Sequence, residues 1–125
     1  RFEVATSCIP LLAGLRCSLD LIEKENTPID RLQKIKQYSS HLWVELNKIE
    51  MVDTILNGPP PAGLVSFCLP QKNSTKEIVK QLGKKGLWIR SLEDPVCLRA
   101  CVHFMSEEIE IEALIEAIAT IESPI

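Results

Sequence analysis

Gly86-Leu-Trp-Ile-Arg-Ser-Leu-Glu-Asp-Pro-Val-Cys-Leu-Arg-Ala-Cys-Val-His-Phe104 is the segment around which the rest of this chain is arranged. Its β-branched and aromatic residues lie on either side of an acidic, proline-containing turn, which is the pattern of a β-hairpin. The segment therefore predicts two short strands, at about Leu87–Arg90 and Cys97–His103, joined through Glu93-Asp94-Pro95.

Strand alternation places two arginines of this hairpin on one face. Successive side chains of a strand point to opposite faces, so apolar Leu98, Ala100 and Val102 suit a covered face. Arg99 then points the other way, and the same argument applied to the first strand turns Arg90 to that open side. Neighbouring guanidiniums on a rigid strand suit bidentate binding of a carboxylate. We expect the open face to carry Trp88, Arg90, Cys97, Arg99, Cys101 and His103.

Less specific interpretations of these side chains are commoner in proteins. Arginines on a sheet face are usually solvated or paired with acids, and Glu93 and Asp94 lie nearby in the sequence. His103 alone is more often a structural or surface histidine than a base. Cysteines beside an arginine can have a lowered thiol pKa, but an ordinary buried cysteine is the usual case. Pattern alone leaves these alternatives open.

The remainder of the chain predicts helices and two further strands. Thr27-Pro28-Ile29-Asp30 and Ser74-Thr75-Lys76-Glu77 are N-terminal capping patterns. We expect an α+β fold, with helices on one face of a small mixed or antiparallel sheet of three to four strands, and one domain over residues 1–125. We expect a first helix that is capped by Thr6 or Ser7 and ends at Glu25-Asn26, a second from Thr27 to about residue 49, and a third from Ser74 to Gly83 or Gly86. A fourth helix should begin at Ser106, with Ile109, Leu114, Ile118 and Ile121 pointing inward. The two further strands are expected at Val52–Leu56 and Gly63–Leu69.

Composition limits the classes of function. The chain has 125 residues, a net charge of −3 and an acidic pI, which argues against a general nucleic-acid-binding protein. We expect no membrane partner, since no apolar run reaches the roughly 18 residues that a span needs. Five cysteines without a Cys-x-x-Cys pair predict neither a disulfide framework nor a zinc site. Reduced cysteines in a cytoplasmic protein are the expectation.

The sequence contains no recognisable set of catalytic residues. The sequence offers no nucleophile–base pair and no glycine-rich phosphate loop. From its residues alone the chain is a ligand-facing domain, and we assign no catalytic residue.

Several segments in the correct order resemble a known family. Arg1-Phe-Glu-Val-Ala-Thr6 before a Leu-Ala-Gly-Leu helix is similar to the start of the C-terminal domain of class V aminotransferases. Pro61–Phe67 resembles the strand of that small domain, Leu82–Ile89 its helix–glycine–strand passage, and Leu98-Arg99-Ala100 its carboxylate-binding segment. These are pyridoxal 5'-phosphate (PLP) enzymes with the aspartate-aminotransferase-type fold, and the resemblance extends over nearly the whole chain.

The resemblance implies roles for three residues. Arg99 would bind the α-carboxylate of an amino-acid substrate, and Arg90 would make a second contact at the mouth of the same pocket. Thr6 would reach the cofactor phosphate of the partner subunit in a homodimer. The Schiff-base lysine and most phosphate ligands would belong to a large domain that is absent from these 125 residues, so we expect the chain alone to be inactive.

The hairpin turn distinguishes members of this family. Cysteine desulfurases carry a reactive cysteine on a loop a few residues beyond the first arginine, whereas this chain has Ser91–Pro95 there, without a cysteine. The compact turn resembles L-cysteine/cystine C–S lyases of the cyanobacterial type. The implied reaction is a β-elimination that releases sulfide or persulfide, followed by pyruvate and ammonia.

Alternatives remain open at this stage. Within the family, desulfurase, aminotransferase and epimerase activities are possible outcomes of the same small domain. Outside it, the chain would be a free-standing amino-acid-binding or regulatory α+β module without catalysis. The apolar helix stripes Leu11–Ile22 and Leu32–Ile49 predict partial exposure and association in the absence of a partner domain.

Overall fold

The computed structural model describes residues 8–70 and 74–121 of the chain. It contains two compact units, Arg1–Arg31 and Leu32–Ile125. In these ranges the chain forms α-helices and an antiparallel sheet, so the expected α+β fold is confirmed. The elements are α1 (Ile9–Glu25), α2 (Pro28–Leu46), β1 (Asp53–Thr54), β2 (Leu64–Cys68), α3 (Thr75–Lys84), β3 (Arg90–Glu93), β4 (Val96–Cys101) and α4 (Glu108–Ala119).

The first unit contains α1, which contributes no buried residue. Pro10 lies in its first turn, where a missing backbone N–H has no cost. The N-cap is Cys8, which makes no side-chain cap bond, and Thr6 and Ser7, the caps expected from the sequence, lie outside the described ranges. The apolar stripe of α1 is exposed in this chain, with Leu11 74% and Leu15 56% accessible.

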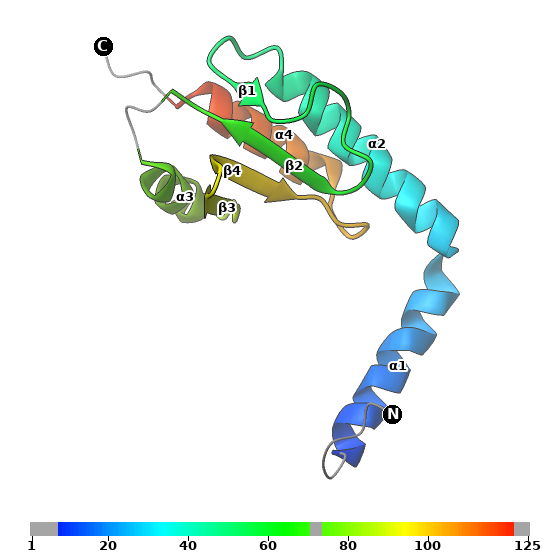
Figure 1. Cartoon of the computed structure of the whole chain (residues 1–125). Coiled ribbons are helices and arrows are strands. Elements are labelled where there is room, and N and C mark those ends of the chain that lie inside the picture. The colour runs from blue at the N-terminus through cyan, green and yellow to red at the C-terminus, as the bar shows by residue number, and fades with distance from the viewer. Residues whose placement is uncertain (1–7, 71–73, 122–125) are drawn as a thin grey trace. The chain divides into compact units, whose positions relative to one another are not determined.

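The second unit is organised by a four-stranded sheet with the order β1-β2-β4-β3. All neighbouring strands are antiparallel, and β4 lies between β2 and β3. The hairpin of β3 and β4 therefore adds directly to the strand predicted at Gly63–Leu69 (Figure 1). This order brings β2, β4 and β3, which carry the candidate site, side by side.

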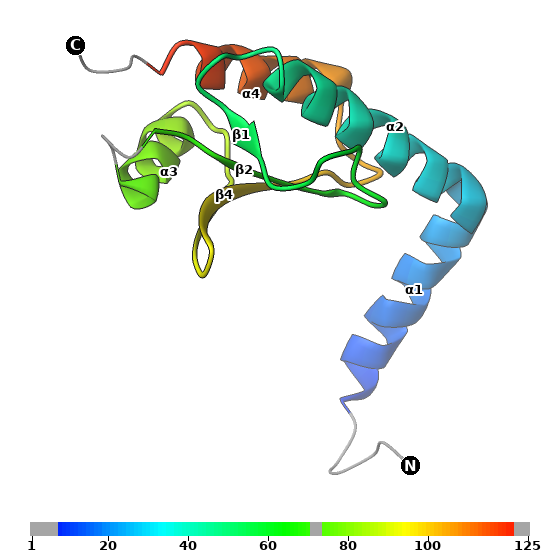
Figure 2. The ribbon, with the colours of Figure 1, turned by 45° about the horizontal axis from the view of Figure 1, so that its top comes forward.

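One face of this sheet is covered by helices. Figures 1 and 2 show α2 and α4 side by side over the sheet. Phe67 and Leu98 are fully buried at the centre of the core, which unites the covered face of the sheet with α2, α3 and α4. The alternate residues of β2 and β4 point to the other face of the sheet, and Ser66 and Arg99 are among them. The other buried apolar residues of the core are Leu42, Leu46, Val52, Val65, Ile78, Leu82, Ala100, Val102, Ile111, Leu114, Ala117 and Ile118.

Both predicted capping patterns form. Thr27 Oγ1 accepts from the backbone N–H of Asp30 at 3.2 Å, and Asp30 Oδ2 accepts from that of Thr27 at 3.2 Å. Ser74 and Glu77 make the same reciprocal pair at the start of α3. Each box satisfies two backbone donors that a helix start leaves unpaired, which is why these helices begin where the sequence predicts.

The strand predicted at Leu87–Arg90 is wrong apart from Arg90, because Leu87–Ile89 form an irregular segment after α3 and the Leu87 amide closes the helix. Gly86 has a φ of +81°, and the backbone N–H groups of Gly86 and Leu87 donate to the carbonyls of Gly83 and Leu82. These two bonds form a Schellman motif, which commits the Leu87 amide to the helix cap. The strand begins only at Arg90.

The last helix also differs from the expectation. It begins at Glu108, and Ile109, expected to point inward, is 72% exposed. The buried stripe instead starts at Ile111 and continues through Leu114 and Ile118, which have helical spacing. In the middle of α2, His41 Nε2 and Glu112 Oε1 of α4 are 2.5 Å apart, an interaction that joins these two helices.

Candidate functional site

Arg90 and Arg99 are paired directly across the hairpin. They are register partners on β3 and β4, and Arg99 is in turn the register partner of Ser66 on β2. Directly paired residues of antiparallel strands point to the same face, with Cβ atoms about 5 Å apart. The structure thus brings the two arginines together as the sequence predicts, and adds Ser66 to the same row.

The two guanidiniums have different environments. Arg99, on the central strand, is half-buried, and its Nε donates a hydrogen bond to Ser66 Oγ at 3.1 Å. Arg90, on the edge strand, is exposed. The inner guanidinium is therefore held by its neighbour, while the outer one is free to reach toward a ligand. Ser66 is the site residue that sequence reasoning missed; the signal was its place among the outward residues of the β2 strand.

The expected pairing of these arginines with the turn acids does not form. Glu93 Oε1 instead accepts from Lys76 Nζ of α3 at 2.8 Å. In the described ranges, 8–70 and 74–121, no carboxylate forms an ion pair with Arg90 or Arg99. Like charges directly opposite each other destabilise a strand pair, so an anionic ligand between the two guanidiniums would relieve a repulsion that the fold leaves in place.

The hairpin has no room for a reactive loop. Glu93 pairs with Val96, so only Asp94 and Pro95 lie between the strands. Cys97, the nearest thiol, is 1% exposed. A persulfide-carrying cysteine needs an accessible thiolate, and the turn of this hairpin, Asp94-Pro95, does not present one.

The remaining cysteines are free, and their environments differ. Burial, with smaller effects from neighbouring Cys97 and Asp53, raises the pKa of the Cys68 thiol. Cys101 follows Arg99 by two residues and is exposed. The sequence favoured ordinary buried cysteines at Cys97 and Cys101, and the structure bears this out for Cys97 but not for Cys101, which is the accessible thiol on this strand.

Two other predicted members of the open face lie apart from the arginine pair. Trp88 precedes the strand and places its indole ring against Gly83 of α3. His103 follows β4, where its N–H donates to Ser106 Oγ at 3.0 Å and its Nδ1 accepts from the Met105 N–H. Its role in the described structure is to stabilise a turn. Thr6 lies outside the described residues.

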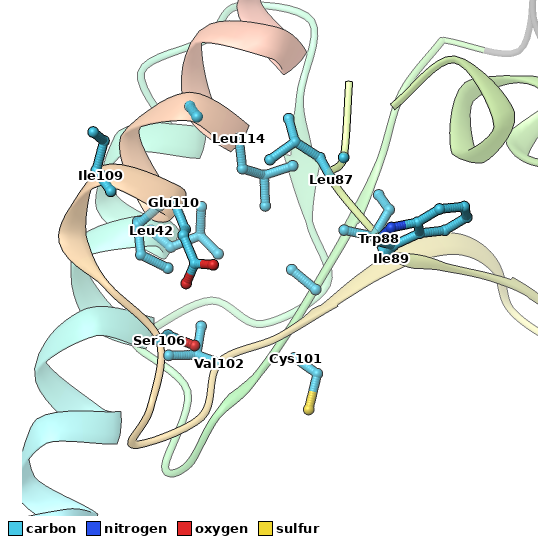
Figure 3. Close-up of a pocket in the computed structure, with 14 residues that line it drawn as sticks. Leu42, Leu87, Trp88, Ile89, Cys101, Val102, Ser106, Ile109, Glu110 and Leu114 are labelled. Atoms are coloured by element: carbon cyan, nitrogen blue, oxygen red, sulfur yellow. The ribbon is translucent and has the colours of Figure 1, made fainter. Parts of the chain in front are cut away.

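A pocket of about 500 Å³ lies on the helix-covered side of the sheet, between α4, β4 and the segment after α3 (Figure 3). Its wall is mainly apolar, and its two polar side chains are engaged in helix and turn caps. Glu110 accepts from the Glu107 N–H, and Ser106 accepts from the His103 N–H. Ligand sites orient their ligands through free polar groups, so the arginine row is the better candidate. The labelled wall residues are Leu42, Leu87, Trp88, Ile89, Cys101, Val102, Ser106, Ile109, Glu110 and Leu114.

The described residues include no lysine in the setting of a Schiff base and no metal-ligating cluster. Every lysine in the described ranges is exposed, whereas a lysine that forms a Schiff base needs a desolvated setting that lowers its pKa. The described ranges also hold no group of three metal-ligating side chains. None of the helices in this part of the chain combines the length and the apolar character that a bilayer span requires.

Comparison with solved structures places this geometry in a known fold. The chain is similar to the cystine C–S lyase C-DES, solved in complex with its reaction product cysteine persulfide, with a TM-score of 0.90 and 39% identity. The alignment covers 96% of this chain and 32% of that one. A C-DES variant with glycine covalently linked to its PLP cofactor matches equally well, over 96% of this chain and 31% of that one. This chain thus spans about a third of the length of C-DES.

More distant structures share the fold alone. A NifS-like protein from Rickettsia africae matches with a TM-score of 0.62 and 18% identity over 71% of this chain and 28% of its own. A decarboxylase from Sulfurospirillum multivorans matches with a TM-score of 0.57 and 20% identity, over 68% of this chain and 24% of its own. No family model and no curated protein matches the chain. The fold is class V aminotransferase-like, which confirms the resemblance read from the sequence.

Proposed function

We propose that this chain is the C-terminal, substrate-carboxylate-binding part of a PLP-dependent carbon–sulfur lyase that acts on cystine or cysteine. The observation that carries the proposal is the 39% identity to C-DES over 96% of the chain, with an arginine pair on the open sheet face. Since the chain spans a third of C-DES, the activity belongs to a longer polypeptide in this proposal.

Arg99 is the principal carboxylate contact. A guanidinium is a planar fork of donors that matches a carboxylate bidentately, and a strand at the centre of the sheet holds it rigidly. Half-burial of Arg99 reduces competition from water, which strengthens the charged hydrogen bonds. The role of Arg99 is to fix the orientation of the amino acid relative to the reacting carbon, and positioning of this kind lowers the barrier of the chemical step.

Arg90 supplies a second cation on the outer side of the same carboxylate site. Its exposure places it at the edge of the sheet, from which it can contact a second anionic group of a long substrate such as cystine. The overall reaction breaks the Cβ–S bond of the substrate. The sulfur leaves with the electron pair as persulfide from cystine or as sulfide from cysteine, and the three-carbon fragment is hydrolysed to pyruvate and ammonia.

The cofactor is held by the part of the polypeptide outside these 125 residues in this proposal. The exposed lysines of the described ranges support this division, because none has the setting of a Schiff-base lysine. We propose further that the complete protein is a cytoplasmic homodimer in which Thr6 reaches the cofactor phosphate of the partner subunit.

The hairpin favours a lyase over a desulfurase. The two-residue connection between β3 and β4 and the burial of Cys97 leave no accessible cysteine on the hairpin turn. A sulfane sulfur released at this site would therefore leave on the product rather than on the protein.

The direct test is turnover by the complete polypeptide that contains this chain, purified with PLP. We expect stoichiometric pyruvate and ammonia from L-cystine, with persulfide as the sulfur product. Absence of pyruvate from both L-cystine and L-cysteine would overturn the proposal and favour a free-standing amino-acid-binding module. Incubation of the 125-residue chain with PLP and borohydride should leave its lysines unmodified, as measured by mass spectrometry.

A further inference from the structure

Ser66 lies in one row with Arg99 and Arg90 across the sheet. Ser66 on β2, Arg99 on β4 and Arg90 on β3 are successive register partners across three adjacent strands. Residues paired in this way point to one face of the sheet. The row runs from a neutral hydroxyl at one end to an exposed guanidinium at the other.

The hydrogen bond between Ser66 and Arg99 selects one edge of the guanidinium. Arg99 Nε donates to Ser66 Oγ at 3.1 Å, which engages the donor nearest the side-chain stem. A guanidinium can bind a carboxylate through Nε and one Nη or through both Nη atoms. With Nε engaged, the pair of Nη atoms is the edge that remains. In the described ranges neither Nη of Arg99 has a hydrogen-bond partner.

A hydroxyl is suited to this position for an electrostatic reason. It accepts the Nε–H without carrying a charge, so the full positive charge of Arg99 stays available for a ligand. A carboxylate at the same register would hold Arg99 more strongly, but it would also neutralise the guanidinium and compete with the ligand carboxylate. A hydroxyl therefore orients the arginine without competing for its charge.

We infer that Ser66 is a positioning residue for the carboxylate site: it holds Arg99 so that both Nη atoms face the substrate carboxylate. This inference rests on the proposed function. It predicts that loss of the hydroxyl weakens carboxylate binding, while the chemical step, which takes place at another atom of the substrate, changes little.

The first experiment uses the complete polypeptide with PLP and compares Ser66→Ala, Ser66→Thr and the unchanged protein. For Ser66→Ala we expect the KM for L-cystine to rise roughly 3- to 10-fold, which corresponds to one hydrogen bond, with kcat within about 2-fold. Ser66→Thr keeps a hydroxyl on a strand-compatible side chain and should restore KM. Glycine has a carboxylate but no sulfur. The affinity of the Ser66→Ala protein for glycine, measured by a titration that follows the cofactor absorbance, should fall by the same factor.

Two further variants separate orientation from a general effect on the sheet. Ser91 is the register partner of Leu98, so it points to the opposite face, and Ser91→Ala should leave KM unchanged. Ser66→Asp should raise KM more than Ser66→Ala, because its carboxylate competes for Arg99. A readout without cofactor is the Arg99 Nε–H resonance of the 125-residue chain, which should exchange with water faster in Ser66→Ala than in Ser66→Thr.

The outcomes distinguish this inference from the proposed function. If the unchanged protein neither turns over L-cystine nor responds to glycine, the proposed function fails. If it is active and Arg99→Ala weakens substrate binding, but Ser66→Ala and Ser66→Asp both have normal KM, only the role of Ser66 is overturned. Equal effects of Ser66→Ala and Ser91→Ala would also overturn it.

Discussion

Lys76 at the start of α3 donates a 2.8 Å hydrogen bond to Glu93, the last residue of β3. This ion pair ties the hairpin to α3 and keeps the turn carboxylate away from the two arginines. Its hydrogen bond and charge lower the pKa of Glu93 and raise the pKa of Lys76 from their ordinary values of 4.5 and 10.5.

These shifts predict a pH window for the stabilisation. A lowered carboxyl pKa stabilises the fold above pH 4.5, and the effect is lost as the pH falls through the lowered value. A raised amine pKa stabilises below pH 10.5 and is lost as the pH rises through the raised value. Glu93→Gln should therefore lower the Tm slightly at pH 7 and have no effect near pH 2.

Thermal melts at several pH values measure this difference. Glu50→Gln removes an exposed acid that forms no ion pair in the described ranges, and it is the matched control. Because both partners are exposed, 1 M salt should reduce the difference at pH 7. An equal Tm loss at pH 2 and pH 7 would contradict the prediction.

Arg99→Ala in the complete polypeptide should reduce kcat/KM for L-cystine by about 10- to 150-fold, the equivalent of a charged hydrogen bond of about 1.5–3 kcal/mol. Arg90→Ala should reduce kcat/KM less, because the Arg90 side chain is exposed and, within residues 8–70 and 74–121, has no supporting hydrogen bond of the kind that Ser66 makes with Arg99. Steady-state kinetics check both. Normal kcat/KM in Arg99→Ala would remove this residue from the site.

Gly63→Ala should destabilise the second unit strongly. A Cβ at this position would lie 2.1 Å from the backbone oxygen of Val102, and the Val102 N–H donates to the Gly63 carbonyl at 2.7 Å. Because that oxygen belongs to the backbone beside β4, relief needs movement of the sheet, at a cost of about 3 kcal/mol. Denaturant unfolding measures this loss.

Gly58→Ala is the control for that substitution. Nothing lies within 4 Å of a Cβ built on Gly58, so its replacement should change the free energy of unfolding by less than about 0.5 kcal/mol. Similar values for the two alanine variants would show that the close approach at Gly63 does not limit the fold.

Thiol modification should follow burial. Cys101 is exposed, Cys97 is buried, and burial raises the pKa of Cys68, which lowers its thiolate fraction. With iodoacetamide at pH 8, peptide mass spectrometry should find Cys101 modified well before Cys68 and Cys97 in the folded chain. In urea the three rates should converge. Early modification of Cys97 in the folded chain would contradict the burial that argues against a persulfide carrier.

Local patterns predicted the elements where side chains act on their own backbone. The capping boxes at Thr27 and Ser74 stood in the sequence because a cap involves residues three positions apart. The parity of Arg99 followed from its apolar neighbours Leu98 and Ala100. These interactions are short in range, so one sequence contains all of their participants.

Features that depend on competition between elements were not predicted. The Leu87 amide donates to the α3 cap rather than to a strand. Gly86, whose positive φ makes this cap possible, is in the sequence equally consistent with the start of a strand. Ile109 is as hydrophobic as a core residue, but it is exposed, and Ile111 is the isoleucine that α4 buries in the core. Ser66 could be recognised only once β2 was known to pair with β4, because residues 66 and 99 are far apart in the sequence.

The two-residue turn at Asp94 and Pro95 has a consequence for how this site tolerates change. Side chains alternate with a period of two, so a shift of β3 by one residue against β4 would turn Arg90 to the helix-covered face while Arg99 stays in place. Insertions of a single residue here should therefore separate the two cations without unfolding the sheet. The separation of Arg90 and Arg99 by nine positions in the sequence is as much a part of the carboxylate site as the guanidiniums themselves.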